Sequence, residues 1–260
     1  MEKLAQLQIE KGLEYWFKYE KPNKSVVELA EYSGEKELII NCTQLDGYPH
    51  GSKYESAKEK KRVLSEWCRF LTENPHAFTS LSFGTRMPQE LFNAVCEQKD
   101  LKRLTIKWGV YPDISAISKL QELEYLHIGS GAGVLSVEPI AELKNLVMLS
   151  VENFQKINDY SALVALDNLE LLSIEGAALS PQYIHIDSLD FLREMKQLRS
   201  FSLLTARVKS KDYTPILELE NIEYLTIESP KEVKSIYDQL VKLPKLKYGL
   251  LIERPDLYKL

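Results

Sequence analysis

Few residues of this chain have the types and spacing that a reaction centre requires. No phosphate-binding glycine loop, dinucleotide fingerprint, zinc-protease helix or nucleophile-elbow motif occurs. The four histidines are far apart in the sequence: His50, His76, His127 and His185. A single histidine without a paired acid or nucleophile makes a poor catalyst. We therefore predict that the chain is not an enzyme, with no catalytic residues, no metal and no cofactor.

The spacing of the cysteines also argues against a disulfide or zinc-binding role. Cys42, Cys68 and Cys96 are too few and too scattered for a disulfide framework or for a zinc site of the usual paired spacing. We predict buried free thiols instead.

Composition limits the class of partner. The chain has 260 residues, 44% of them hydrophobic, which is enough to bury a continuous core. Its formal net charge of -5 argues against nucleic acid or an anionic membrane as the main partner. A basic protein partner is favoured. Glu10, Lys11 and Glu14 interrupt the apolar start, and no run of about 18 apolar residues occurs. We expect a cytoplasmic protein that does not contact the membrane.

One short pattern organises most of the chain: an apolar residue, two variable positions, then apolar, variable, apolar. Its eight copies begin at Phe78, Leu101, Leu123, Leu146, Leu169, Leu198, Ile222 and Leu246, at steps of 22 to 29 residues. A fixed period in this range predicts a solenoid. Apolar residues at the fourth and sixth positions predict one short strand per copy, with the strands forming a parallel ladder.

The residues before each copy predict the return path. Apolar residues recur about three, six and nine places earlier, as in Val137, Ile140 and Leu143. This spacing is typical of a short helix or 3₁₀ turn packing behind the strand. The predicted fold is an α/β solenoid with a parallel β-sheet on its concave face and short helices or 3₁₀ turns on its convex side.

The stretches LKRLTI, LEYLHI, LVMLSV, LELLSI and IEYLTI resemble the leucine-rich repeat family, in the short-repeat class known from bacteria. The resemblance covers roughly residues 78 to 252 and implies a horseshoe-shaped interaction domain. The chain departs from the family where an asparagine usually follows the strand. Those places hold Met87, Gly109, Gly131, Phe154, Ala177, Ala206, Pro230 and Arg254. We therefore expect irregular turns there.

Residues 1–75 do not fit the period, and we predict that they form an N-terminal cap on a solenoid of about eight repeats over residues 76–260. Leu4, Leu7, Leu13, Trp16 and Phe17 indicate a first helix, residues 38–40 a strand and residues 62–71 a second helix. An open solenoid end would expose apolar core, which such a cap would cover.

Outward-facing positions of the predicted strands form the candidate binding surface. If the fourth and sixth positions point inward, the third, fifth and seventh line the concave face. Exposed aromatic and apolar residues in a cluster suggest binding anchors. The predicted partner-binding residues are Arg103, Tyr125, His127, Met148, Glu152, Leu171, Glu175, Tyr224, Glu228 and Tyr248.

The predicted neighbours Glu152 and Glu175 would lie roughly 5 Å apart by strand spacing and repel each other. A partner's Lys or Arg would relieve that repulsion. As an acid–base pair they are poor candidates, because an open, wet surface would not shift their pKa values usefully.

Three functions agree with these features. The first is a non-enzymatic module that binds a protein partner on the concave face. The second is an immunity or inhibitor protein that neutralises a toxin enzyme, and the third is a self-associating structural repeat protein. We expect a monomer for the first two. Tyr183 and His185, in the insertion that lengthens one repeat, are secondary binding candidates.

Overall fold

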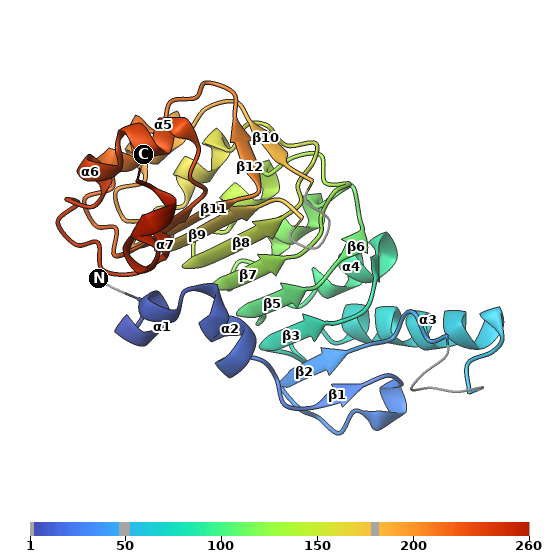
Figure 1. Cartoon of the computed structure of the whole chain (residues 1–260). Helices are drawn as coiled ribbons and strands as arrows, with labels where there is room; N and C mark the ends of the chain where they lie inside the picture. Colours follow the sequence, from blue (N-terminus) through green and yellow to red (C-terminus); the bar gives the residue numbers. More distant parts are fainter. Residues whose placement is uncertain (1–2, 47–52, 178–181, 260) are drawn as a thin grey trace.

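A long parallel sheet is the main element of the computed structural model, which describes residues 3–46, 53–177 and 182–259 (Figure 1). Within these residues the sheet has nine strands, in the order β1 (Ser25–Val26), β2 (Glu37–Ile40), β3 (Ser80–Phe83), β5 (Arg103–Ile106), β7 (Tyr125–Ile128), β8 (Met148–Glu152), β9 (Leu171–Glu175), β11 (Ser200–Leu204) and β13 (Tyr224–Ile227). The leucine-rich repeat solenoid predicted from the sequence is confirmed.

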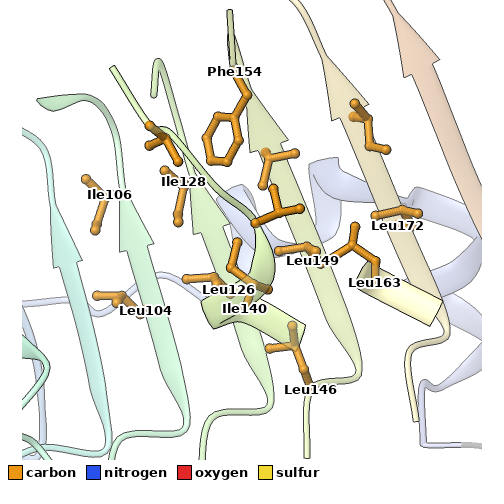
Figure 2. Packing of buried hydrophobic residues seen from close by; sticks show 14 of the residues in the cluster. Leu104, Ile106, Leu126, Ile128, Ile140, Leu146, Leu149, Phe154, Leu163 and Leu172 are labelled. Atoms are coloured by element: carbon orange, nitrogen blue, oxygen red, sulfur yellow. The ribbon is translucent and has the colours of Figure 1, made fainter. Parts of the chain in front are cut away.

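The strands pair in register, so equivalent positions of successive repeats stand side by side. Leu104 pairs with Leu126, Leu126 with Leu149, and Leu149 with Leu172. All four side chains are buried, because alternate residues of a strand share one face. Figure 2 shows these leucines in a row, with Ile140 and Leu163 of the return segments packed near them.

Short turns on the convex side complete each repeat. They are the 3₁₀ turns η2 (Ser115–Lys119), η3 (Glu138–Glu142), η4 (Ser161–Ala165), η5 (Asp190–Glu194) and η6 (Thr214–Glu218), with the helix α4 (Gln89–Val95) in the first repeat. Beyond the strands, β4 (Met87–Pro88) pairs with β6 (Gly109–Val110), and β10 (Ile184–Ile186) pairs with β12 (Ala206–Val208). Strands β4, β6 and β12 begin at places where the family usually has asparagine: Met87, Gly109 and Ala206.

The eighth predicted strand does not form, which corrects the sequence-based repeat count. Tyr248 makes a single bridge to Tyr224, and the chain then enters α7 (Leu250–Glu253). Gly249 lies between them with φ +95°, a backbone conformation that ends an extended strand. The C-terminal end is covered by α5 (Lys231–Ser235), α6 (Tyr237–Leu240) and η7 (Pro255–Leu257). The Tyr258 hydroxyl donates to the Ile227 carbonyl.

The N-terminal region has two parts with different positions. Strands β1 and β2, the turn η1 (Leu29–Glu31) and the helix α3 (Ala57–Glu73) extend the solenoid at one end. Trp67 of α3 is buried and its indole donates to the Val27 carbonyl at 2.8 Å. The preceding helices α1 (Gln6–Lys11) and α2 (Leu13–Tyr19) lie instead beside the central strands (Figure 1). The first predicted helix is therefore two helices, broken at Gly12, and it does not cover the end of the solenoid.

The three thiols are free, as predicted. Cys42 and Cys96 are buried and Cys68 is half-buried. Burial raises the pKa of the Cys42 and Cys68 thiols to about 12, so both remain protonated at neutral pH.

Replacing a leucine of the buried row should destabilise the fold strongly. We expect Leu126→Ala to lower the free energy of unfolding by about 2–5 kcal/mol, because the fully buried side chain leaves a cavity between neighbouring repeats. Urea denaturation followed by circular dichroism measures this. The matched control is Leu135→Ala, where the leucine is 60% exposed and the expected change is within about 0.5 kcal/mol. Equal losses for both variants would contradict the assigned core.

Candidate binding surface

The third positions of neighbouring strands form a row on the concave face, opposite the main core. Tyr125 pairs in register with Met148, and Met148 with Leu171. Further along the row, Ser200 pairs with Tyr224. The predicted anchors are thus neighbours on one surface.

The chain's own N-terminus covers these anchors. Residues 3–20, called here the N-terminal segment, place Leu4, Ile9 and Trp16 against the sheet, where they form a second hydrophobic cluster with Val147, Met148 and Leu171. Met148 is only 3% exposed and Leu171 only 1%. The expectation that both are free on the concave face is wrong, because a helical pair from the same chain occupies their surface.

Aromatic contacts extend this covering along the row. The rings of Trp16 and Tyr125 lie 4.4 Å apart, and Phe17 meets His127 edge-on at 4.8 Å. Gly12, with φ +53°, passes close to Tyr224: a Cβ at this position would lie 3.1 Å from the tyrosine Cζ. A glycine is needed here for both its backbone conformation and its size.

Buried charges hold the start of the segment. Glu170 accepts hydrogen bonds from the backbone N–H groups of Lys3 at 2.6 Å and Leu4 at 2.9 Å. Arg199 donates to the Leu4 carbonyl at 2.8 Å. Arg199 also bonds Glu170 at 3.3 Å and Glu223 at 2.8 Å, and all three side chains are buried. Burial opposes ionisation of Glu223, but hydrogen bonds from Gln6 and Arg199 hold its pKa below its ordinary value.

Sequence reasoning missed Glu170, Arg199 and Glu223, which occupy the second position of their repeats. The backbone N–H groups of positions two and three both donate to one backbone carbonyl of the preceding repeat, as those of Arg199 and Ser200 do to the Glu170 carbonyl. The alternation of side chains between the two faces of the sheet therefore does not extend to the second position. The alternating charges Glu170, Arg199, Glu223 at repeat spacing were the available signal.

Arg103, a predicted site residue, also contacts the N-terminal segment. Its guanidinium lies 3.2 Å from Glu20, 3.6 Å from Glu37 and 5.4 Å from the centre of the Tyr125 ring. It links the end of the segment to the edge of the concave face.

The acidic side chains lie at the ends of the strands. Glu152 and Glu175 are register partners, as predicted. Burial, together with the charge of Glu152, raises the pKa of Glu175, while a hydrogen bond from Ser173 at 2.7 Å opposes the shift. Glu228 accepts from the Thr205 backbone N–H at 2.7 Å. Tyr248 is half-buried beside Tyr224.

His127 is a poor catalyst in this environment. Its Nδ1 lies 3.0 Å from the Ser150 hydroxyl, and burial lowers its pKa to about 4, so the ring is neutral at pH 7. Within the ranges that the structure describes, no group of three or more His, Cys, Asp or Glu side chains is placed to hold a metal ion. Of the other histidines, His50 lies outside these ranges.

The insertion candidates lie away from the concave rows. Tyr183 is half-buried, with the Arg207 guanidinium 3.9 Å from its ring centre, and His185 is exposed on β10. Residues 178–181 of the insertion lie outside the described ranges.

Beside the N-terminal segment the concave face has an open cavity of about 350 Å³. Phe17 and Trp16 line one side, and Ile39 and Phe83 are among its apolar lining residues. Its polar lining includes Ser82, Thr105, Lys107, Asn41 and His127. Phe17 is 48% exposed, so an aromatic edge of this cavity faces solvent.

Comparison with solved structures supports the fold. Internalin C2 of Listeria monocytogenes is 19% identical, with a TM-score of 0.51 over 71% of this chain and 80% of that chain. An internalin, InlF, of the same organism is 18% identical, with a TM-score of 0.42 over 67% of this chain; the match spans 62% of the InlF chain. A leucine-rich repeat protein of Leptospira interrogans is 14% identical, with a TM-score of 0.38 over 87% of this chain and 76% of that chain.

No protein-family model matches the chain, and no curated protein sequence matches it either. The chain has the leucine-rich repeat fold, which it shares with internalin C2. Among the helices that the structure describes, none has the length and apolar character to cross a membrane.

Neutralising Glu175 should stabilise the protein at neutral pH. Its pKa is raised in the fold, so the carboxylate charge costs stability above that pKa, and the cost disappears below the unfolded value, near 4.5. We expect Glu175→Gln to raise the melting temperature at pH 7, and the gain to shrink as the pH falls through the raised pKa and to be lost below about 4.5. The amide oxygen keeps an acceptor for Ser173.

Melting curves from pH 3 to pH 8 measure this effect. Glu142→Gln on η3, where the glutamate is exposed, is the matched control and should change little at any pH. A gain for Glu175→Gln that is constant across the pH range would show that charge is not its cause.

Proposed function

We propose that this chain is a non-enzymatic interaction module that binds a protein partner through its concave face. The observation that carries the proposal is the open cavity between the N-terminal segment and strands β2, β3, β5 and β7. It combines apolar and aromatic walls with hydroxyl and amine groups, the mixture typical of protein-binding sites where one anchoring side chain is buried.

The cavity suits an apolar or aromatic side chain of the partner. Ile39 would contact its carbon atoms, and the exposed edge of Phe17 would pack on it from solvent. Ser82, Thr105 and Lys107 offer hydrogen bonds to the partner's backbone around that anchor. The partner is bound by shape and hydrogen bonding, without a chemical step.

Net charge favours a basic partner. The chain carries -5, and Glu152, Glu175 and Glu228 lie along one side of the concave face. A partner Lys or Arg near Glu152 would offset the repulsion between Glu152 and Glu175. A cytoplasmic location and a monomeric state remain predictions from the sequence.

An inhibitor of a toxin enzyme would use the same surface as an adaptor. Occlusion of an active site requires only that the partner dock on the concave face, so the identity of the captured protein separates these roles. A self-associating structural protein would instead show a mass that rises with concentration in light scattering.

Filling the cavity should abolish partner binding. We expect Thr105→Trp to reduce capture of the partner from source-cell lysate at least about tenfold, because the indole occupies the anchor's place. Quantitative mass spectrometry of material retained by wild-type and variant baits measures this. Circular dichroism checks that the variant is folded.

The same substitution elsewhere is the control. Thr72→Trp places an indole at an exposed position of α3 and should leave capture unchanged. A partner retained equally by wild type, Thr105→Trp and Thr72→Trp would remove the cavity from the proposal.

A further inference from the structure

The N-terminal segment is attached to the solenoid by contacts that are separate from the main core. Its buried side chains, Leu4, Ile9 and Trp16, pack only in the small cluster on the concave face. The main core lies on the other side of the sheet, between the strands and the convex turns (Figure 2). The two clusters share no residue.

The repeats pair without help from the segment. Strands β7, β8 and β9 bond one another through their own backbone groups, and the segment adds no strand to the sheet. Its helices have only 6 and 7 residues, and the N-cap residues Ala5 and Gly12 supply no side-chain acceptor. Isolated helices of this length are unstable in water, so these two depend on the surface beneath them.

The surface beneath the segment recognises general features of a peptide. Glu170 accepts from two consecutive backbone N–H groups, and Arg199 donates to a backbone carbonyl. Every peptide offers these groups. The helical part contributes Ile9 from α1, and Leu13 and Trp16, at i and i+3, from α2. Apolar side chains at such spacing anchor a helix in a groove.

The fit of the segment is incomplete. In the part of the chain that the structure describes, the buried Trp16 Nε1 and Arg103 Nε have no hydrogen-bond partner. Buried donors without acceptors cost free energy. Three large apolar or aromatic side chains of the segment remain exposed: Leu7 at 51%, Phe17 at 48% and Tyr19 at 57%. A peptide that paired these donors or buried more apolar surface would bind the same groove more tightly than the segment does.

We propose that residues 3–20 are an intramolecular ligand on a peptide-binding groove, formed by Tyr125, Val147, Met148, Leu171 and Tyr224 with Glu170 and Arg199, and that an amphipathic helical segment of the partner replaces them there. The partner segment has a short extended start, bonded by Glu170 and Arg199, followed by apolar side chains at helical spacing. This inference rests on the proposed function for the existence of a partner, but its test requires none.

Hydrogen exchange of the wild-type chain is the first test. Amides of α1 and α2 should exchange at least about tenfold faster than those of β8 and β9, because the segment releases without unfolding of the sheet. Equal protection in the helices and the strands would show that the segment unfolds only with the whole domain, and would overturn the proposal.

Binding of the segment in trans is the second test. The full chain carrying Ile9→Glu and Trp16→Glu should leave its groove free and bind a fluorescein-labelled synthetic peptide with the sequence of residues 1–20, measured by fluorescence anisotropy. The peptide carrying the same two substitutions should bind at least tenfold more weakly. Adding Leu171→Lys to the protein should weaken binding of the native peptide to a similar extent.

A milder variant guards against loss of the fold. Gly12→Ala strains the backbone at φ +53° and crowds the Tyr224 ring without adding charge, and it should also bind the peptide, more weakly. Two folded variants that bind no peptide, or a double variant without the native circular dichroism spectrum, would overturn the proposal. So would dimers of either variant in light scattering, because the occupant would then be a second copy.

The two proposals fail separately. Thr105→Trp tests the cavity with a partner, whereas the peptide test uses the groove and no partner. If the peptide binds and Thr105→Trp still captures the partner as well as wild type does, the groove proposal stands and the cavity proposal fails.

Discussion

Parallel pairing of strands at a nearly constant repeat length is the constraint on which the rest of this structure depends. Because Leu104, Leu126, Leu149 and Leu172 stand in one register, each repeat buries its leucine against the same position of its neighbours. A shift of one residue in any strand would turn its apolar side chains to the opposite face. The convex turns follow from this register, since Ile117, Ile140 and Leu163 recur every 23 residues to fill the space behind the sheet.

The same register creates the concave face and places a row of apolar side chains on it. Tyr125, Met148 and Leu171 become neighbours as soon as the ladder forms, and water would contact a continuous apolar row. The N-terminal segment removes that row from solvent. The segment also donates hydrogen bonds to the buried carboxylates of Glu170 and Glu223, which both contact the guanidinium of Arg199. Backbone N–H groups of Lys3 and Leu4 and the Gln6 amide supply further donors, which desolvated carboxylates require.

Covering one part of the concave face leaves the other part open. The segment ends where Phe17 and Trp16 border the cavity over β3 and β5, so the aromatic side chains of the segment also shape the free site. The groove and the cavity are therefore adjacent, and release of the segment from the groove would also remove the Trp16 and Phe17 wall of the cavity. Charges of both signs line the cavity, at Glu20, Lys21 and Lys107, whereas the acidic pair Glu152 and Glu175 lies at the ends of β8 and β9.

The sequence by itself determined the repeat, the parallel strands, the convex turns and the residues that face the concave side, because each follows from local periodicity and from stacking at one spacing. It predicted the Glu152–Glu175 pair for the same reason. Only the tertiary structure decided that Met148 and Leu171 are covered, that Gly249 ends the ladder, and that Glu170, Arg199 and Glu223 are buried together. These features depend on contacts between residues as far apart as Leu4 and Arg199, and on backbone geometry at the start of each strand, which no local pattern encodes.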